Sequence, residues 1–578
     1  MREILARIKS RPLVFTEMLA ASLLASILGL ASSLFVIQVL NRYVAHGVDA
    51  TLATLAIGTT LAILLEFGFR QVRLRLAAFV NAPYDEGLTN SSFAILTGAK
   101  SNAIESLTPG LRQQIMSGAD TIQNAYSAPN VAALLDVPFA LIFVAVLFLL
   151  SPPLAIIVLV FLALVFTTAM LTLSSLRQPT REMTITGGRR NALVGSAISA
   201  ADTVRAFNAQ KLIRKQWRNE SGLFQRLIRT ITGRQGLVQS ISASAQALMS
   251  VSVITVGAVL VVRGHLDIGG MIGANILASK ALGPIIKLAQ MGESFAKARQ
   301  ATGLLQEFSK VPLERTEGSA LDNYTGRVEF QDLAFIHPGQ RAPLFESLSL
   351  KLEPGALLPI SGANAAGKTT MARLLVGLLE PTRGKILVDG VDLGQVVPEW
   401  WRTQIVYLPQ EPEFLNSTFR ENLQGANTNL DDAALNTLAR TAGLKSFIDQ
   451  SPDGFDTRME KNGGNLSLGI RRRFALARAL ATDGMLVIID DPTEGLDAEG
   501  SRMVAEALNG LSKRGRTVIV FSHDAHILSS APYYMDLNSK PMPKMVKKDA
   551  DKHAPAPLAA VPASGKKPTA ASAKKATS

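Results

Sequence analysis

Six apolar stretches of about 20 residues constrain the fold of this chain more than any other feature. A bilayer core about 30 Å thick needs a helix of about 20 predominantly apolar residues to cross it. Buried helices of a soluble protein would instead show amphipathic faces, which these stretches mostly lack. The sequence therefore predicts six membrane-spanning helices, over residues 18–40, 50–69, 131–150, 154–172, 240–262 and 268–290.

The composition agrees with a membrane protein and narrows the chemistry. Hydrophobic residues make up 48% of the chain and charged residues only 18%, a balance tilted towards membrane proteins. The chain has no cysteine, which excludes disulfides, thiolate metal sites and cysteine nucleophiles. The net charge of +13 would suit nucleic acid, but more than half of it comes from residues 540–578. Much of the rest lies in connections between spans, so we expect no nucleic-acid partner.

The charge of these connections predicts the orientation in the membrane. Twelve Arg or Lys residues lie between positions 177 and 234, and five lie between positions 70 and 112. The three short connections contain only two such residues, Arg42 and Arg263. Since cytoplasmic connections carry the excess of positive charge, both long connections and both termini are predicted to be cytoplasmic. We expect a multi-pass protein of a bacterial inner membrane, and the first apolar run is too long for a cleaved signal peptide.

Glu66, Asp136 and Lys280 are charged residues that fall inside or at the ends of the apolar stretches. A charge there is costly and usually faces the interior of the bundle or a water-filled path. Glu66 and Asp136 fit a position at the cytoplasmic interface equally well. Lys280 is the better candidate for a residue of a transport pathway.

Residues 361–370 fit the phosphate-binding pattern G-x-x-x-x-G-K-[ST], between an apolar run (357–360) and a helical pattern (371–379). Gly362 and Gly367 let the backbone turn its N–H groups towards phosphate oxygens, and the helix N-terminus adds its dipole. Lys368 would reach the β- and γ-phosphates, and Thr369 would ligate Mg²⁺. The predicted nucleotide-binding residues are Gly362, Ala363, Asn364, Ala365, Ala366, Gly367, Lys368, Thr369 and Thr370.

A second element of the same site lies about 120 positions further on. Residues 486–490 are four apolar residues followed by Asp490, the pattern of a buried strand whose carboxylate holds Mg²⁺ directly or through water. Gln410 and His523 each follow an apolar strand pattern. Taken alone, each is more often a surface glutamine or a capping histidine. Short strand patterns alternate with helical ones from residue 328 to about 537, which predicts an α/β domain.

The order of these residues carries a family resemblance. Together with residues 466–470 (LSLGI), Asp491, the stretch from Gly495 to Asp497, and His523, they resemble the motif set of ATP-binding cassette proteins. Six spans joined N-terminally to such a cassette resemble an exporter half-transporter. Residues 34–42 (LFVIQVLNR), 201–206 (ADTVRA) and 273–278 (GANILA) resemble stretches of the type I protein-secretion permease/ATPases, the alkaline-protease and haemolysin exporter group.

This resemblance implies a fold and an arrangement of sites. A six-helix α-helical transmembrane domain is followed by an α/β P-loop ATP-binding cassette domain, and two cassettes sandwich ATP and Mg²⁺. Asp491 takes the position of the general base, His523 orients the attacking water, and Gln410 senses Mg²⁺ and that water. Each nucleotide also meets the signature segment of the other chain. The implied signature residues are Leu466, Ser467, Leu468 and Gly469.

The chain departs from the family pattern in four places. Asp491 stands where glutamate is usual, which withdraws the carboxylate by about 1.5 Å. Leu468 and the following Ile470 replace glycine and glutamine in the signature, and Lys461 replaces a glutamate. His337 replaces the tyrosine that stacks on adenine and offers less stacking area. These departures predict either slow ATP hydrolysis or a partner half-transporter that carries the usual family motifs. They leave both a homodimer and a heterodimer open.

The sequence predicts five segments and leaves several functions open. The favoured function is export by a type I secretion system, with a periplasmic adaptor and an outer-membrane channel as partners. Export of lipid or small molecules is the alternative, as is a weakly hydrolysing regulatory subunit. Only about 15 residues precede the first span, which argues against a leader-cleaving peptidase domain. The segments are a cytoplasmic N-terminus (1–13), the transmembrane domain (14–292), a linker (293–325), the cassette (326–538) and a Lys/Ala/Pro-rich tail (539–578) expected to be disordered and either solvated or attached to anionic lipid.

Overall fold

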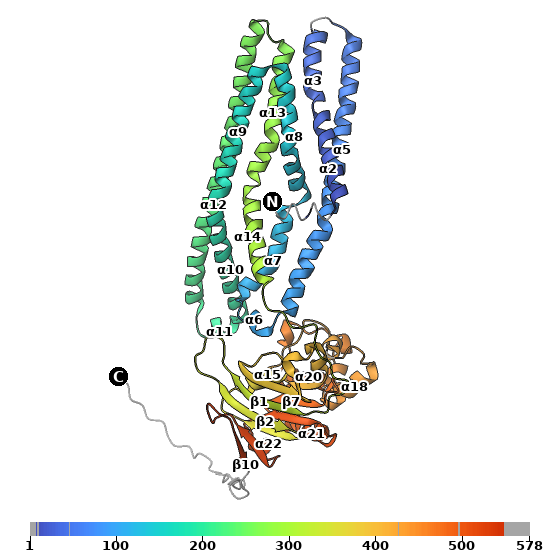
Figure 1. Ribbon diagram of the computed structural model, residues 1–578, viewed down its shortest axis with the longest axis vertical. Coiled ribbons are helices and arrows are strands. Elements are labelled where there is room, and N and C mark those ends of the chain that lie inside the picture. The colour runs from blue at the N-terminus through green and yellow to red at the C-terminus, as the bar shows by residue number, and fades with distance from the viewer. Residues whose placement is uncertain (1–6, 8–10, 45–46, 426, 495–497, 548–578) are drawn as a thin grey trace, which may run out of the picture. The chain divides into compact units, whose positions relative to one another are not determined.

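The computed structural model describes residue 7 and residues 11–44, 47–425, 427–494 and 498–547. Its contacts divide the chain into two compact units, Met1–Glu314 and Arg315–Ser578. The division falls inside the predicted linker, residues 293–325. In the described residues the long helices belong to the first unit, and the sheets belong to the second (Figure 1).

Six helical stretches in the described part of the first unit are long and apolar enough to cross a membrane, which confirms the predicted number. The first combines α2 (Pro12–Gly29), α3 (Ala31–Gln38) and a short π-helix (Val39–Tyr43). The fourth combines α9 (Pro152–Ser175) and α10 (Arg177–Ser199). The others are α5 (Asp49–Gly98), α8 (Ala128–Leu150), α12 (Gln210–Val262) and α13 (Ile268–Gln290).

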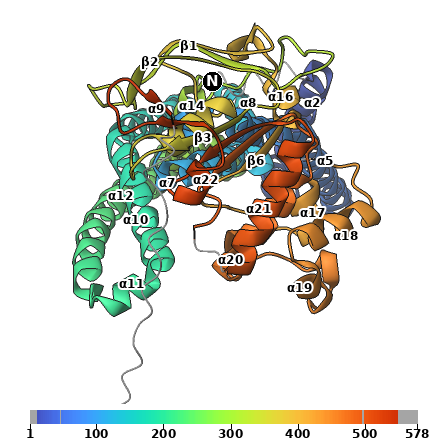
Figure 2. The ribbon, with the colours of Figure 1, turned by 90° about the horizontal axis from the view of Figure 1, so that it is seen from below.

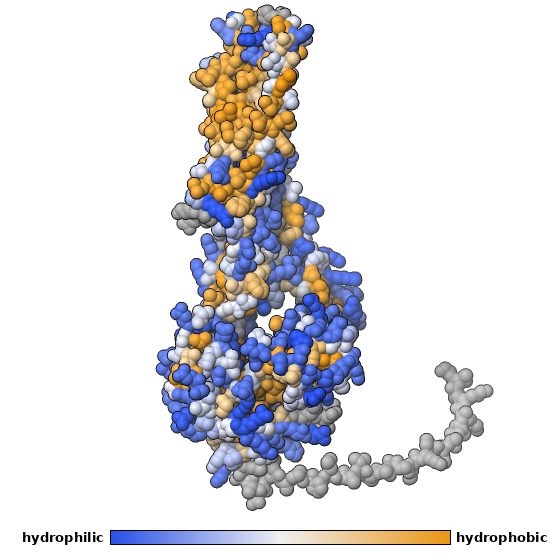
Figure 3. All heavy atoms as spheres, turned by 90° about the vertical axis from the view of Figure 1, so that its right-hand side faces the viewer, coloured by the Kyte–Doolittle hydropathy of each residue, from blue (hydrophilic) through white to orange (hydrophobic). Residues whose placement is uncertain are grey.

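Small residues let the last spanning helix lie close to its neighbours. Helix α13 packs against α3, α8, α9 and α12 and buries a row of small side chains that includes Ala274, Ala278 and Ala281. A side chain at Gly273 would lie 2.3 Å from the side chain of Ile37, so α3 and α13 meet where only glycine fits. On the face shown in Figure 3, hydrophobic side chains gather in a band over this unit, with hydrophilic ones beyond both ends.

Two of the spanning helices continue far beyond what a bilayer requires. Helices α5 and α12 are 50 and 53 residues long, which corresponds to about 75–80 Å at about 1.5 Å per residue. The polar segments that follow the span 50–69 and precede the span 240–262 are therefore helical and continuous with those spans. Four shorter helices complete the described part of this unit: α6 (Ser101–Glu105), α7 (Pro109–Ala125), α11 (Ala201–Ala206) and α14 (Gly292–Phe308).

The second unit contains two sheets. The antiparallel sheet has the order β2 (Phe345–Leu352), β1 (Val328–Phe335), β4 (Arg383–Val388) and β5 (Val391–Asp392). The core sheet is parallel except at one edge and has the order β10 (Lys544–Lys547), β9 (Tyr533–Asp536), β3 (Leu357–Ser361), β8 (Thr517–Phe521), β7 (Leu486–Asp490) and β6 (Ile405–Leu408).

Apolar side chains fill the space on both faces of the core sheet. One hydrophobic cluster includes Phe330 of β1, Met371 and Ile519, and therefore joins the antiparallel sheet to the core sheet. The other includes Phe419 and Phe474, and packs helices against the opposite face (Figure 2). The helices of the unit are α15 (Lys368–Leu375), α16 (Pro398–Thr403), α17 (Phe419–Gln424), α18 (Asp432–Thr441), α19 (Lys445–Asp449), α20 (Leu468–Leu480), α21 (Ala498–Lys513) and α22 (Ala525–Leu528).

The structure differs from the sequence prediction at two boundaries. The helix after the phosphate-binding turn was predicted to reach residue 379 but ends at Leu375, because Gly377 adopts a φ of +76°. The tail was predicted to lack structure from residue 539. Residues 544–547 instead form β10, which pairs antiparallel with β9, and the Glu346 N–H donates to the Pro541 carbonyl at 2.8 Å. A short edge strand in a Lys- and Pro-rich segment cannot be predicted from composition. Residues 544–547 form a strand because they pair with β9, and their own sequence shows no strand pattern.

Candidate nucleotide site

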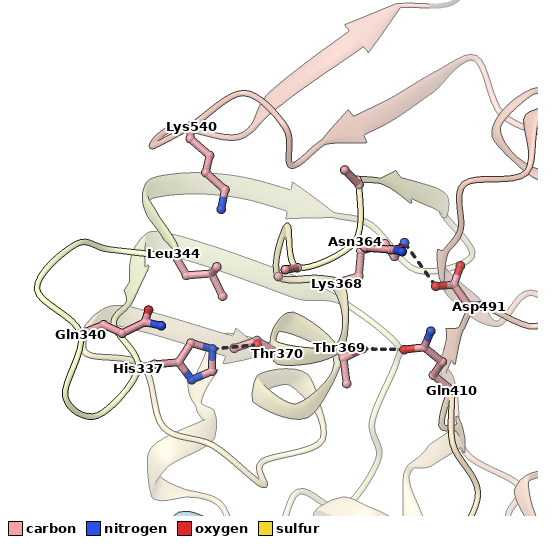
Figure 4. A pocket seen from close by; sticks show the side chains of 13 residues that line it. His337, Gln340, Leu344, Asn364, Lys368, Thr369, Thr370, Gln410, Asp491 and Lys540 are labelled. Carbon is pink, nitrogen blue, oxygen red and sulfur yellow. Dashed lines mark hydrogen bonds and ion pairs between the residues drawn. The ribbon is translucent and has the colours of Figure 1, made fainter. Parts of the chain in front are cut away.

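A cavity of about 480 Å³ opens where β3 gives way to α15 (Figure 4). The strand, the turn and the helix N-terminus form one wall, and segments from four other parts of the unit complete it. The lining residues are His337, Gln340, Leu344, Ala363, Asn364, Ala365, Gly367, Lys368, Thr369, Thr370, Gln410, Asp491 and Lys540.

The turn between β3 and α15 needs glycine at its last position. Gly367 precedes the first helical residue with a φ of +112°, and a side chain there would lie 2.9 Å from Leu344. Seven of the nine predicted phosphate-binding residues line the cavity. The other two lie beneath the turn: the Gly362 carbonyl accepts a hydrogen bond from Lys368 Nζ at 3.0 Å, and Ala366 is buried.

The predicted phosphate ligand and the predicted base are paired with each other. Lys368 Nζ lies 3.2 Å from Asp491 Oδ2, and the two side chains are only 7% and 4% exposed. Asp491 follows β7 and adopts a φ of +46°, a conformation that aspartate tolerates better than most residues. Its other oxygen, Oδ1, lies 3.4 Å from Nδ1 of His523, whose side chain is 69% exposed. The structure therefore brings Lys368, Asp491 and His523 together.

Asp490, the last residue of β7, presents an unpartnered carboxylate. The residue is 1% exposed, and neither carboxylate oxygen has a hydrogen-bond partner in the described part of the chain. Burial, aided by the charge of Asp491, raises its pKa to about 6, while the nearby Thr369 hydroxyl and the Lys368 ammonium act in the opposite direction. A buried, orphaned carboxylate beside a phosphate-binding turn fits Mg²⁺, which binds through one or two carboxylates together with substrate phosphates.

Gln410 connects the turn to the segment after β7. Its Oε1 accepts a hydrogen bond from the Thr369 hydroxyl at 3.3 Å, and its Nε2 donates to Glu494 Oε2 at 3.0 Å. Arg472 lies 3.7 Å from the same Glu494 oxygen. The hydrogen bond from Gln410, together with the charge of Arg472, lowers the pKa of Glu494. Gln410 therefore stands between a predicted Mg²⁺ ligand and a carboxylate that stays ionised.

The far end of the cavity has an aromatic and a cationic side chain. His337 Nε2 lies 3.4 Å from the Thr370 hydroxyl, and its ring packs edge-on against Phe335 with centroids 5.0 Å apart. Gln340 and Leu344 lie beside it. Figure 4 shows Lys540 directing its side chain towards this end from the opposite wall.

The signature residues lie outside this cavity. Ser467 precedes α20 and its hydroxyl accepts a hydrogen bond from the Ile470 N–H at 3.4 Å. Leu466 packs on a hydrophobic cluster, Leu468 is 43% exposed, and no signature residue is among the lining residues. A single copy therefore does not bring the signature to its own phosphate-binding turn. Gly495, Leu496 and Asp497, the remaining stretch of the motif set, lie outside the described residues.

Sequence reasoning missed four residues of the site. Gln340 and Leu344 lie in the connection between β1 and β2, and no pattern marks either one. Glu494 lies three positions after Asp491, and its bond to Gln410 depends on a contact across 84 positions. Lys540 was counted with the tail, where its neighbours are also lysines; only the position of β9 beside β3 brings it to the cavity.

Chemically, this site can bind a triphosphate and a divalent cation. The backbone of the turn and Lys368 supply positive charge, while Asp490 and Thr369 supply oxygen ligands. Asp491 and His523 supply a carboxylate and an imidazole for moving a proton.

Family models match both units. Residues 15–285 match the model described as the ABC transporter transmembrane region, and residues 345–494 match the model described as ABC transporter. The first match covers the predicted spans, and the second begins at β2 and ends at Glu494.

Curated relatives match across both units. The chain is 27% identical over 524 residues to the Toxin RTX-I translocation ATP-binding protein of Actinobacillus pleuropneumoniae, covering 90% of this chain and 73% of the relative. It is 26% identical over 525 residues to the alpha-hemolysin translocation ATP-binding protein HlyB of Escherichia coli O6:H1, with the same coverage.

A solved structure has the same fold. It is described as a bacterial Atm1-family ABC exporter with ATP bound, and it matches with a TM-score of 0.78 at 19% identity, covering 91% of this chain and 94% of that chain.

Proposed function

The chain is an ABC half-transporter, a multi-pass membrane ATPase of the exporter type, and we propose that it is the permease/ATPase subunit of a type I protein secretion system. The observation that carries this proposal is the match to toxin translocation proteins along about 520 residues, through spans and cassette alike. The substrate would be an unfolded secreted protein. The partners would be a second half-transporter, a periplasmic adaptor and an outer-membrane channel.

In the proposed reaction, Lys368 exchanges one negative partner for another. It leaves the Asp491 carboxylate, 3.2 Å away, and binds the β- and γ-phosphates of ATP. This exchange frees Asp491 to accept a proton from the attacking water, while His523 orients that water and contacts the γ-phosphate. ATP binding would thereby release the base that its own hydrolysis requires.

Mg²⁺ would be held by Asp490 and Thr369, with Gln410 next to it. Bound there, it would neutralise charge on the phosphates. His337 would stack on adenine, with Lys540 on the opposite wall. The remaining γ-phosphate contacts would come from Leu466, Ser467, Leu468 and Gly469 of a second cassette, because these residues lie outside the cavity of their own chain.

The proposed orientation places the cassette and both termini in the cytoplasm. Its support is the excess of Arg and Lys in residues 70–112 and 177–234, which include the polar parts of α5 and α12. Export would then run from the cytoplasm outward, driven by closure of two cassettes on ATP and reset by hydrolysis.

A secretion assay tests the proposed substrate class. Deletion of the gene should remove one or a few proteins from the culture medium, and a plasmid copy should restore them, whereas a Lys368→Ala copy should not. Quantitative mass spectrometry of the medium measures this. An unchanged set of secreted proteins together with an altered lipid or small-molecule profile would contradict the proposal and favour the alternative substrates.

Turnover by the purified protein tests the ATPase role separately. In lipid nanodiscs the wild-type chain should hydrolyse ATP, and Lys368→Ala should abolish hydrolysis. Tight ATP binding without turnover would instead identify a regulatory subunit that depends on an orthodox partner.

A further inference from the structure

The first unit contains its own cavity, of about 210 Å³, among four of its membrane-spanning helices. Helices α2, α5, α8 and α13, which are labelled in Figure 1, supply the walls. Ionisable side chains are rare within spans, and usually functional. Six ionisable side chains line this cavity: Glu66, Asp136, Lys280 and Lys287 within the predicted spans, and Arg70 and Arg73 just beyond one of them.

Two of the four cations in the cavity are neutralised and two are not. Arg70 pairs with Glu66, and Arg73 pairs with Asp136. Lys280 Nζ donates only to the Gly29 carbonyl, at 2.8 Å, which does not neutralise its charge. Neither Lys280 nor Lys287 has a carboxylate within ion-pair distance in the described part of the chain. The cavity therefore carries two uncompensated positive charges.

The geometry directs these charges at one place. Lys280 and Lys287 are seven positions apart on α13, which puts them two turns apart on the same face of the helix. The side chain of Arg73 is 8% exposed, and its Nε has no hydrogen-bond partner in the part of the chain that the structure describes. A buried donor without an acceptor is costly, so a ligand that supplies one would be stabilised.

The cavity extends from one membrane interface into the nearer half of the bilayer. Arg70 directly follows the predicted span 50–69, and Lys287 lies three residues before the end of 268–290. Lys280 lies ten residues before that end, or about 15 Å at about 1.5 Å per residue, and lysine side chains reach towards the interface. Helix α5, which supplies Glu66 and Arg70 to the cavity, also exposes apolar side chains: Leu64 and Phe67 are 62% and 61% exposed.

We propose that this cavity binds the phosphate headgroup of an anionic phospholipid through Lys280, Lys287 and Arg73, with the acyl chains lying on the apolar face of α5. The observations favour an anionic amphiphile because the positive cavity begins at a predicted membrane interface, and because α5, which lines it, also carries exposed apolar side chains. A zwitterionic headgroup also has a phosphate, but its ammonium group would be repelled by the two unpaired lysines. Basic cavities between spanning helices are a known kind of anionic-lipid site.

Tryptophan quenching by brominated lipids tests this proposal in the full-length protein. Phe67→Trp places a reporter on α5, one residue after the cavity-lining Glu66. The native tryptophans, Trp217, Trp400 and Trp401, lie outside the predicted spans. In nanodiscs without ATP, brominated phosphatidylglycerol should quench the reporter more strongly than brominated phosphatidylcholine. Lys280→Met and Lys287→Met should each lower this preference about fivefold, as expected for one lysine at an anionic membrane surface.

Matched variants separate a specific site from general charge effects. Lys280→Arg should keep the preference for phosphatidylglycerol, and so should Lys215→Met, which removes an exposed lysine of α12. Monodisperse elution of each variant excludes misfolding as the cause of a loss.

Four outcomes would overturn the proposal. Equal quenching by the two lipids, or an unchanged preference in the Lys280→Met/Lys287→Met double variant, would remove the lipid site. Displacement of the brominated lipid by inorganic phosphate would assign the cavity to a soluble anion, and displacement by an oligoglutamate peptide would assign it to a polypeptide carboxylate. The measurement requires neither ATP nor transport, so it can fail while the proposed secretion function stands.

Discussion

Asp491 is the residue on which turnover should depend most directly. Its carboxylate is buried against Lys368 and is one methylene shorter than a glutamate. Asp491→Glu should extend it by about 1.5 Å, and because misplacement by about 1 Å can cost about 100-fold in rate, turnover should rise by up to that factor. The measurement is steady-state phosphate release in nanodiscs. Asp491→Asn is the control, which should bind ATP without hydrolysing it, and a glutamate variant no faster than wild type would show that the base position does not limit the rate.

Asp490 should make the stability of the Mg²⁺-free cassette depend on pH. Its folded-state pKa is about 6 against an ordinary value of 3.8, so the folded protein holds the proton more tightly than the unfolded chain does. Stability should therefore fall as the pH rises from about 4 to about 6, by at most about 3 kcal/mol at ~1.4 kcal/mol per pKa unit. Trp400 and Trp401 report cassette unfolding by fluorescence. Asp490→Asn should remove this part of the pH dependence. If the variant and the wild type lose stability identically between about pH 4 and about pH 6, the raised pKa of Asp490 is not the cause.

At the scale of residues, the sequence predicts the site where chemistry dictates local spacing and fails where the fold supplies the neighbour. The residues from Gly362 to Thr370 are neighbours in the sequence, so their types alone predict a phosphate site. The bond between Gln410 and Glu494 and the entry of Lys540 into the cavity depend on the order of strands in the core sheet. Nothing in the residues around Lys540 encodes that order.

The start of helix α20 should restrain turnover. Leu468 is its first residue and is 43% exposed, so its side chain would crowd a phosphate approaching from a second cassette. Leu468→Gly should raise ATP turnover severalfold at little cost in stability, because the first turn of a helix tolerates glycine better than its interior. Leu415→Ala, which alters another exposed leucine of the same unit, should leave turnover unchanged. Equal rates for wild type and Leu468→Gly would refute the crowding.

Strand β10 should matter for ATP binding although it lies in the lysine-rich end of the chain. Truncation after Lys547 keeps β10 and Lys540, so the affinity for a fluorescent ATP analogue should be unchanged. Truncation after Ser539 removes both and should weaken binding. Lys540→Met separates the two contributions and should weaken binding by roughly fivefold, about 1 kcal/mol for a partly exposed charge. If both truncated proteins bind equally, β10 and Lys540 are not part of the site.

At the scale of elements, the spans are predictable and their ends are not. Bilayer thickness sets the length of an apolar run, so the count of six follows from composition alone. The C-terminal end of α5 and the N-terminal end of α12 lie far outside those runs. Polar residues form helix there because neighbouring helices cover one face. Helix α15 ends early because Gly377 has a positive φ. The apolar pattern continues to residue 379 and therefore gives no sign of this end.

For the whole molecule, the proposed function requires two cassettes, and the simplest assembly is a homodimer. Two differently tagged copies, co-expressed and purified through one tag in nanodiscs, should co-purify, and random pairing should give the second tag at about half the amount of the first. Recovery of one tag alone, together with a different half-transporter, would identify a heterodimer. In a heterodimer, Asp491 and Leu468 of this chain would belong to different nucleotide sites at the interface. Each of the two sites would then lack one of the usual family residues.

Helix α5 is long enough to act as a lever, and Pro83, which removes one backbone hydrogen bond, is the place in its polar part where it would bend most easily. Its 50 residues extend about 75 Å, and the apolar run near its N-terminal end takes up less than half of that length. If the membrane-embedded part serves as a fulcrum, a tilt of about 5° displaces the far end by several ångströms, since the arm beyond the bilayer is about 45 Å long. A small rearrangement of side chains between spans, such as the ion pair of Arg73 with Asp136, would thus be amplified at the other end without bending the backbone. Stiffness along α5 is then a functional property, and a glycine pair inserted in its exposed middle would uncouple its two ends while leaving each end folded.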